Sequence, residues 1–481
     1  MSSDSSVPQF INFGKNVAFQ AAVLEQPRSE AEVLEVLDRH AGRKIRVVGR
    51  LHSWSECPRG EDVVIDLQYL NQVKTQKIDG RIWAEIGAGC QIKRVLSELA
   101  YQADSTLPSL GLITEQSIAG AMATGTHGSG KHSLSHYADE IRIATYDAES
   151  GKPVIRTVRD GAELEAARCS LGCLGVIVSV GLWARPCYRV EEFFERYASL
   201  DETLEQEIRH PLQQFYYIPW SWDFYAQHRF ETESARSALA ALYRLYFFLT
   251  FDLGLHLALI PMVRWFRLKS FTKFFFRKLL PWTVVKRWRV RDWSSDQLIM
   301  EHELFTHIEI EIFVKRSRMK QTLELVRDLI RLFDGSSAEF SDEITRLIDD
   351  KDVSDRLREC SGRYTHHYPI CIRRILPDAT LVSPASGGEE DWFAVSFISL
   401  ERPQDRSGFL LFAERMAELS AKLFDARPHW GKVCPLSGEV IERLYPRLAE
   451  FRQISGQFDP RGRFRNAWAD RMLFNAESSA S

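Results

Sequence analysis

Three features are scarce or missing in this sequence, and each absence excludes a class of protein. The eight cysteines include no CxxC pair and show no disulfide framework, so we expect free thiols in a reducing compartment and no metal site. A formal net charge of only −3 gives no global reason to expect a nucleic-acid partner. The first ten residues, MSSDSSVPQF, lack a charged segment followed by an apolar one, so we see no secretory signal and expect a cytoplasmic protein.

The length of 481 residues suggests two or three domains. In the first part, helix and strand patterns alternate, which is typical of an α/β or α+β domain. Ser29 and Glu32 form a capping box that begins a helix, and the apolar spacing over Gln91–Ala103 predicts another. Strands are expected at Ile45–Val48, Val63–Leu67, Ile82–Ile86 and Val176–Leu182. Near Cys187 the composition shifts toward aromatic and charged residues, which suggests a domain boundary.

The second part predicts further strands and an amphipathic helix. Apolar and polar residues alternate over Glu309–Val314, as in a strand, and Gln321–Phe333 has helical spacing. Ile370–Ile375 and Trp392–Ser399 also have the composition of strands. Glu309 and Glu311 share one face of their strand, and we interpret that face as solvated or paired.

The stretch Val47–Ser55, VVGRLHSWS, leads from a strand into a turn that carries one histidine. Gly49 would let backbone N–H groups approach a phosphate closely. His52 is therefore a candidate nucleophile or cofactor anchor. Taken alone, the loop is equally compatible with an ordinary surface or capping histidine, which is the simpler interpretation.

The stretch Pro108–His132 is dense in glycine, alanine, serine and threonine. Small side chains over such a length indicate close backbone approach to something large and flat or anionic, or else a flexible loop. Ile118, Ala121 and Met122 are too apolar for a solvated linker, so we favour the wall of a cofactor site.

An apolar run, Leu245–Val263, stands in the second part. It barely reaches the length of a spanning helix, and Asp252, Gly254 and Pro261 interrupt it. Around it, residues 244–291 combine many basic residues with phenylalanine and tryptophan, and Asp252 is their only acidic residue. This composition suits a membrane interface, and a buried helical hairpin with a solvated basic face explains it equally well.

Five motifs in one order carry a resemblance to a known family: Val47–Ser55, Leu107–Gly130, Ala166–Val180, Pro369–Pro384 and Ala426–Trp468. With them the chain resembles the aldonolactone oxidoreductases, a gulonolactone-oxidase-like branch of the vanillyl-alcohol-oxidase type of flavoproteins. The resemblance implies an α+β, two-domain FAD-binding fold of the PCMH type with an α/β cap domain. It implies an FAD domain at 12–187, a cap domain at 188–425 with an apolar, basic insert near 238–291, and a segment at 426–474 that returns to the FAD domain.

The resemblance implies FAD as the cofactor, bound covalently through His52, which matches the family's flavin-linked histidine. Leu51 stands where a second glycine is usual, and a leucine tolerates a positive φ poorly. The implied cofactor-binding residues are Val48, Gly49, Arg50, Leu51, His52, Ser53, Ser109, Gly111, Ser117, Gly120, Thr124, Gly125, Thr126, His127, Gly128, Ser129, Gly175 and Ile177.

The resemblance also implies the residues that act on the substrate. Arg373 matches an arginine near the flavin and the substrate oxygen, and Lys432, in the sequence HWGK, matches a lysine that assists proton removal. His429 would orient the substrate or the flavin, and Ser129 would help to bind the substrate. Cys371 replaces the family's glutamate, so either polyol binding differs or another group supplies the contact.

The implied reaction is hydride transfer from a carbinol carbon of an aldono-1,4-lactone to flavin N5, with oxygen as the acceptor. Two alternatives stay open. One is an alditol or carbohydrate dehydrogenase that uses another acceptor, and the other is a flavin-binding, membrane-associated protein without lactone turnover. The expected partners are a sugar lactone or polyol, the electron acceptor, and a peripheral membrane contact through residues 245–291, with no nucleic acid.

Overall fold

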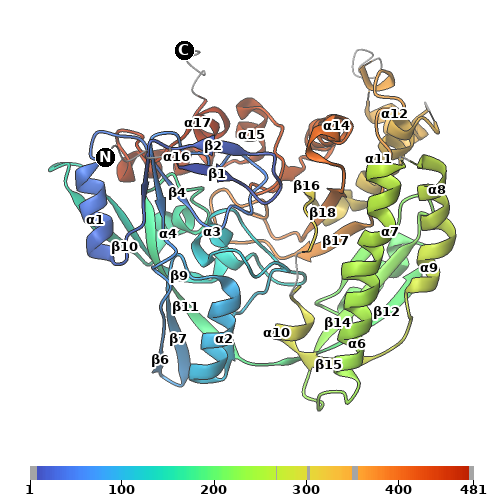
Figure 1. Cartoon of the computed structure of the whole chain (residues 1–481), viewed down its shortest axis with the longest axis horizontal. Coiled ribbons are helices and arrows are strands. Elements are labelled where there is room, and N and C mark those ends of the chain that lie inside the picture. The colour runs from blue at the N-terminus through green and yellow to red at the C-terminus, as the bar shows by residue number, and fades with distance from the viewer. Residues whose placement is uncertain (1–7, 267, 301–303, 338, 349–355, 476–481) are drawn as a thin grey trace, which may run out of the picture.

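Two sheets and a short hairpin, β1-β2, support the N-terminal part (Figure 1). The computed structural model describes residues 8–266, 268–300, 304–337, 339–348 and 356–475. The smaller sheet is parallel, in the order β3-β5-β4, and the larger is antiparallel, in the order β10-β9-β11-β7-β6, with β8 paired to β11. The strands are β1 Gln9–Ile11, β2 Ala18–Gln20, β3 Val23–Glu25, β4 Ile45–Val48, β5 Val63–Asp66, β6 Val73–Ile78, β7 Arg81–Gly87, β8 Ser105–Thr106, β9 Ala138–Tyr146, β10 Pro153–Val158 and β11 Val176–Pro186.

The helices of this part begin where the sequence provides capping groups and buried faces. At the start of α1, the Glu32 N–H donates to Ser29 Oγ (3.2 Å), which confirms Ser29 as the cap, while Glu32 Oε2 accepts from the Arg28 N–H (2.8 Å) and not from the Ser29 N–H of a full capping box. The predicted helix before Ala103 is α2, which buries Val95 and Leu99. The bounds are α1 Glu30–Arg39, α2 Ile92–Ala103, α3 Ile118–Ala123, η1 Leu134–Tyr137 and α4 Gly161–Arg168.

An eight-stranded sheet, in the order β15-β12-β14-β13-β17-β18-β16-β19, dominates the second part. All its pairs are antiparallel, so the fold is α+β. Its first strand along the chain starts two residues after Cys187, although the division into domains itself remains a prediction. The strands are β12 Arg189–Tyr197, β13 Gln214–Tyr217, β14 Phe224–Thr232, β15 Val290–Trp293, β16 Ile308–Lys315, β17 Ile370–Ile375, β18 Trp392–Ser399 and β19 Arg427–Pro428.

One face of the eight-stranded sheet is covered by helices α11 and α14. Phe397 of β18 packs edge-on against Phe412 of α14, with ring centroids 5.6 Å apart, and Phe412 in turn packs against Phe333 of α11. The opposite face is left for a cavity. The helices of this part are α5 Leu200–Glu205, η2 Gln206–Ile208, α10 Ser294–Gln297, η6 Arg316–Arg318, α11 Met319–Asp334, α12 Asp342–Leu347, η7 Pro403–Asp405 and α14 Ser407–Phe424.

The C-terminal helices α15 (Gly438–Leu444), α16 (Leu448–Phe458) and α17 (Ala467–Leu473) return to the N-terminal sheets (Figure 1). The Ile45 N–H donates to the Arg463 carbonyl at 2.8 Å, and Arg46 Nη1 donates to the Phe464 carbonyl at 2.9 Å. The two ends of the chain therefore stabilise each other across the small parallel sheet.

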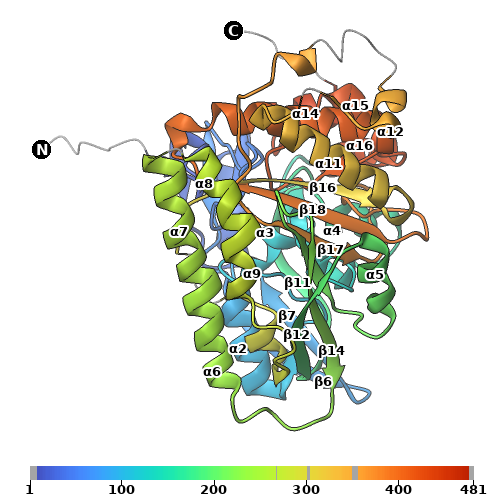
Figure 2. The same cartoon turned by 90° about the vertical axis from the view of Figure 1, so that its right-hand side faces the viewer.

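Residues 240–283 form a helical hairpin at the outer side of the eight-stranded sheet (Figure 2). Its first arm is one continuous helix, Ala240–Trp265, which runs through Asp252, Gly254 and Pro261, the residues that interrupt the apolar run. Three π-helical stretches occur in the hairpin, and one of them begins at Pro261 within the continuous helix. The segments are α6 Ala240–Phe247, η3 Phe248–Leu255, α7 His256–Ile260, η4 Pro261–Trp265, α8 Lys269–Phe274, η5 Phe275–Leu279 and α9 Leu280–Thr283.

His366 in the core makes stability dependent on pH. It is fully buried beside Phe397 and Phe412, and burial lowers its pKa from 6.5 to about 3. Between these two values the unfolded chain binds a proton that the folded chain does not, so stability falls as the pH falls.

We expect His366→Phe to make the pH dependence of the unfolding free energy shallower by about 1.4 kcal/mol per pH unit in this window. Urea titrations at several pH values measure this slope of the unfolding free energy against pH. Phe397→Leu, in the same core, is expected to lower stability without changing the slope, and an unchanged slope for His366→Phe would contradict the assignment.

Candidate active site

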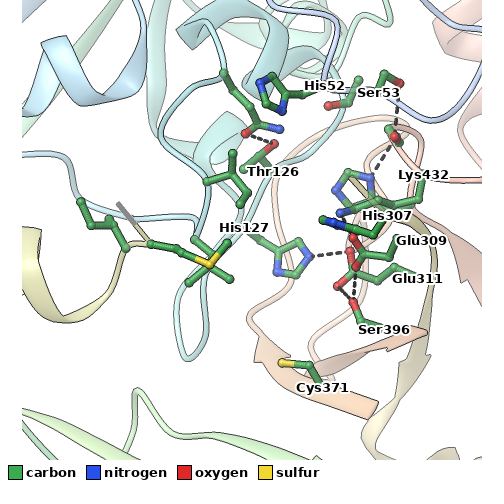
Figure 3. A pocket seen from close by; sticks show the side chains of 18 of the residues that line it. His52, Ser53, Thr126, His127, His307, Glu309, Glu311, Cys371, Ser396 and Lys432 are labelled. Carbon is green, nitrogen blue, oxygen red and sulfur yellow. Dashed lines mark hydrogen bonds and ion pairs between the residues drawn. The ribbon is translucent and has the colours of Figure 1, made fainter. Parts of the chain in front are cut away.

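A cavity of about 590 Å³ lies between the N-terminal loops and the free face of the eight-stranded sheet. This volume is in the range of ligand and cofactor sites. Figure 3 shows side chains from both walls that point toward the same space. His52, Thr126 and His127 come from the N-terminal loops, while Glu309 and Glu311 come from the sheet.

The loop after β4 forms one end of the N-terminal wall. A Cβ at Gly49 would lie 2.3 Å from Ser117 Oγ, so a larger residue would displace that serine. Leu51 adopts a φ of +54°, in the left-handed region that a leucine enters only with strain. The turn is therefore kept although the usual glycine is missing. The His52 ring stacks on Phe13 at 5.3 Å and lines the cavity.

The N-terminal wall fits FAD because it consists largely of backbone and small side chains. Gly49, Ser117, Gly120 and Thr124 all line it. Within the described part of the chain, the backbone N–H groups of Arg50 and Leu51 donate to no protein acceptor. Free N–H groups beside glycines suit a diphosphate, and a wall of small residues lets a flat ring approach closely.

The register of the sheet explains the opposite wall. Side chains on paired positions of neighbouring strands point to the same face, and every second residue along a strand does so. Glu192 pairs with Arg229, Gln214 with Gln227, Cys371 with Tyr216, and Ser396 with Glu311. These residues are therefore brought from six strands to one face, which is the floor of the cavity.

Lys432 and Glu309 form a buried ion pair in this floor. The Lys432 ammonium also lies over the Trp54 ring, 4.3 Å from its centroid. The HWGK segment is tied to both walls, since the Val433 N–H donates to the Glu309 carbonyl (3.0 Å) and the Trp54 N–H donates to the Gly431 carbonyl (2.8 Å). The loop that carries His52 and the loop that carries Lys432 are thus held together directly.

Glu311 lies beside His127, which places Nδ1 3.0 Å from the Gly128 carbonyl and Nε2 3.4 Å from Glu311 Oε2. Burial alone would raise the pKa of Glu311, but His127, His429 and Lys432 hold it well below its usual range. Ser396 Oγ joins the two acids, 2.6 Å from Glu309 Oε1 and 2.9 Å from Glu311 Oε1.

His429 is neutral and acts as a donor. Burial lowers its pKa to about 3, and the Gly431 N–H donates to its Nδ1 at 2.9 Å, so the remaining proton is on Nε2. Among the described residues, His127, Glu311 and His429 place their ligand atoms within 4.8 Å of one another, close enough for a metal ion. The lone pair of His429 Nδ1 accepts from the Gly431 N–H, so its Nε2–H is available as a donor to an oxygen of a ligand.

Arg373 is held by a chain of side-chain amides. Its Nε donates to Gln214 Oε1 at 3.2 Å, and Gln214 Nε2 donates to Tyr216 Oη (2.8 Å) and to Gln227 Oε1 (2.6 Å). Burial alone would lower the pKa of the guanidinium. The neighbouring Cys371 and the buried carboxylates raise this pKa by more than burial lowers it, so Arg373 is charged. Burial raises the pKa of the Cys371 thiol, which faces the cavity as a neutral group (Figure 3).

A further part of the cavity is apolar. The first arm of the hairpin contributes aromatic and aliphatic side chains at helical spacing, and the second arm and the segment before β16 add more. These residues are Phe247, Phe248, Phe251, Leu255, Leu280, Val284, Ile299, Met300, Leu304 and Phe305.

Most of the predicted site residues line this cavity, including Val48, Ser53, Gly175 and Ile177. Five of the predicted residues lie outside its lining. Ser109, Gly128 and Ser129 line a separate small cavity, where the Ser129 hydroxyl donates to the Gln213 carbonyl. Gly111 and Gly125 serve close packing and a turn: a Cβ at Gly111 would lie 2.8 Å from Thr126 Cγ2, and Gly125 has a φ of +78°.

Some residues of the floor carry little signal in the sequence. Gln214, Tyr216, Gln227 and Ser396 were not singled out, because isolated polar residues at alternate positions of aromatic strands are common. The face shared by Glu309 and Glu311 is paired and buried, and the solvated interpretation is wrong.

The fold and the site define an FAD-dependent oxidoreductase that acts on CH–OH groups. A family model described as an FAD binding domain matches residues 21–151, and one described as D-arabinono-1,4-lactone oxidase matches residues 254–472. The chain belongs to the aldonolactone oxidoreductase branch of the PCMH-type FAD-binding family.

Relatives in this family differ in the substrates that their names state. A long-chain alcohol oxidase from an uncultured marine euryarchaeote is 46% identical over 462 residues, which cover 96% of each chain. An L-gulonolactone oxidase from Mus musculus is 24% identical, covering 97% of this chain and 98% of its own. The fold is also that of a cholesterol oxidase from Brevibacterium sterolicum, with a TM-score of 0.71, 14% identity and 98% of each chain covered.

Proposed function

We propose that this chain oxidises an alcohol with a long apolar chain, with FAD as the hydride acceptor and oxygen as the electron acceptor. The main observation behind this proposal is that one cavity is lined both by a cluster of charged groups and by a wall of phenylalanine, leucine, isoleucine and methionine. An alkyl chain gains free energy by burial against such a wall, which offers no hydrogen bonds to the hydroxyls of a sugar. The name of the 46% identical relative supports the same substrate class.

Different residues of the cavity have different roles in the proposed reaction. The chemistry that FAD supplies when bound is acceptance of a hydride from the carbinol carbon. The Lys432 ammonium donates to the substrate hydroxyl oxygen, and the Glu309 carboxylate accepts the hydroxyl proton. The Arg373 guanidinium and the His429 Nε2–H stabilise the substrate oxygen as that proton leaves. The neutral Cys371 thiol adds no charge beside Arg373, where the family's glutamate would add one.

A sugar lactone, such as an aldono-1,4-lactone, is the second candidate substrate. The amides and phenol around Gln214, Tyr216 and Gln227 favour it, since the buried Gln227 Nε2 has no hydrogen-bond partner in the described part of the chain and could donate to a sugar hydroxyl. With an acceptor other than oxygen the same site would serve a dehydrogenase.

A substrate panel tests this proposal. Flavin-loaded protein is mixed with hexadecanol, with butanol, with L-gulono-1,4-lactone or with an alditol, and flavin reduction and peroxide release are measured. The proposal expects the highest kcat/KM for hexadecanol, and about 0.8 kcal/mol per buried methylene predicts a clear gain over butanol. Reduction by the lactone but by neither alcohol would favour the second candidate, and no reduction by any of them would overturn both.

We also propose that His52 carries the flavin covalently, since it lines the cavity beside the free N–H groups of its loop. Acid-precipitated wild-type protein is expected to stay yellow, and His52→Ala is expected to release all its flavin. His307→Ala is the matched control, because His307 also lines the cavity and packs against Phe13, at 5.4 Å. Flavin retained by His52→Ala and lost by His307→Ala would move the link to His307.

We propose in addition that residues 245–291 contact a membrane surface. Among the described residues, Ala240–Trp265 is the one helix long and apolar enough to cross a membrane, and little of it is buried in the protein. The exposure of Leu249, Leu257 and Trp282 supports this contact over the alternative of a buried helical hairpin with a solvated basic face.

A further inference from the structure

The exposed residues of the cavity lining fall into two groups of different chemistry. Only five of its lining residues are exposed. Gly49, Arg50 and Gly120 belong to the N-terminal wall, where the cofactor is proposed to bind. Leu245 and Leu304, which are 52% and 48% exposed, lie beside the apolar wall. A polar substrate gains nothing from a rim of two leucines, whereas an alkyl chain does.

Leu245 of the apolar group is also part of an exposed apolar surface. On the first arm of the hairpin, Leu242, Leu245 and Leu249 follow the i, i+3, i+7 spacing of one helix face, and all are exposed. The end of the first arm and the second arm also expose apolar residues. They are Leu257, Trp265, Phe266, Leu268, Phe271, Phe274, Leu279, Trp282 and Val285. We call these twelve residues the hairpin surface.

Positive charge surrounds the hairpin surface. Lys269, Lys278 and Lys286 are exposed and stand in sequence beside its leucines, phenylalanines and tryptophans. No acidic residue follows Asp252 up to Arg291. An apolar face with a tryptophan that is 89% exposed, Trp282, and with lysines at its edge suits the interface of a bilayer with anionic headgroups.

The first arm lies along the protein and does not leave it. Its inner face is fixed to the sheet, since Tyr243 Oη donates to buried Glu192 Oε1 at 2.7 Å and Phe251 stacks on Phe194 at 5.8 Å. The opposite face is uncovered, and Figures 1 and 2 both show the two arms side by side as an outer layer. One helix thus separates the cavity from the hairpin surface.

We infer that the hairpin surface docks on an anionic bilayer and that the alcohol passes from the lipid into the cavity between Leu245 and Leu304. The route rests on the proposed oxidation of long-chain alcohols, whereas the docking does not. A long-chain alcohol is stored in the bilayer and scarcely dissolves in water, so direct transfer avoids the exposure of its chain to water.

The test uses flavin-loaded full-length protein and vesicles of phosphatidylcholine with or without phosphatidylglycerol. The variant Trp265→Ser/Phe266→Ser/Trp282→Ser changes only residues outside the cavity lining. Tyr101→Ser/Ile208→Ser is the matched control, because both residues are exposed and apolar but lie outside the hairpin. Co-sedimentation measures binding, and oxidation of hexadecanol in the vesicles is compared with oxidation of butanol in solution.

The wild-type protein and the control are expected to bind the vesicles with phosphatidylglycerol, more weakly at high salt. The triple variant is expected to bind at least about tenfold more weakly and to lose hexadecanol oxidation by a similar factor, with unchanged butanol oxidation. Wild-type binding by the triple variant would overturn the docking surface. Lost binding with full hexadecanol oxidation would overturn the route. If the wild type oxidises no alcohol, both the proposed function and the proposed substrate route are wrong. The vesicle-binding measurement would then still test whether the hairpin surface docks on the bilayer.

Discussion

Lys432→Met is expected to lower kcat by about 10³-fold, because it removes the cation that holds the Glu309 carboxylate and the substrate hydroxyl in place. The same change leaves Glu309 buried without a counter-ion, so the protein is also expected to lose about 3 kcal/mol of stability. Rapid-mixing measurement of flavin reduction gives the first effect, and urea unfolding gives the second.

Two further variants separate catalysis from folding. Lys432→Met/Glu309→Gln removes both charges, and we expect it to recover most of the stability and none of the activity. Lys315→Met is the matched control, since the Lys315 ammonium lies over the Trp392 ring at 5.7 Å, as Lys432 does over Trp54, but outside the cavity. Near-normal flavin reduction in the double variant would show that the pair only supports the fold.

Glu192→Gln is expected to destabilise the protein by about 3 kcal/mol. The Glu192 carboxylate is buried, accepts from Arg229 Nε at 2.6 Å and accepts from Tyr243 Oη at 2.7 Å. The neutral amide would leave the buried guanidinium without a counter-ion. It would also weaken the attachment of the hairpin to β12, so faster proteolysis within residues 240–283 is expected together with the change in urea unfolding.

The neighbouring residue provides the control for that variant. Glu191 pairs with Arg289, which is largely exposed, and Glu191→Gln is expected to change stability by less than about 0.5 kcal/mol. Equal effects of the two substitutions would show that the Glu192–Arg229 pair is no stronger than a surface ion pair.

Much of the fold could be predicted because its signals are local. The cap at Ser29 and the strand composition of β17 and β18 depend on residues within a few positions of each other. The hairpin was harder. A proline normally ends or kinks a helix, whereas here a π-helical stretch begins at Pro261 and the helix continues to Trp265.

The site was predicted where a motif sits on one loop and missed where strands assemble it. His52 and Gly49 could be named because they share a turn, and the structure brings both to the cavity. The pairing of Glu309 with Lys432 joins residues far apart in the sequence, so alternation alone could not distinguish a buried acidic face from a solvated one. The amides that hold Arg373 come from β13 and β14, whose register no local pattern specifies.

The hydrogen bond from the Trp54 N–H to the Gly431 carbonyl joins an early loop to a late one. During synthesis the ribosome releases the loop of His52 long before it adds His429, Gly431 and Lys432. Until those residues emerge, the nascent chain has neither a closed cavity nor the ion pair of Lys432. Flavin capture is therefore a step that follows translation, and the amount of FAD present while the finished chain folds sets the yield of active enzyme.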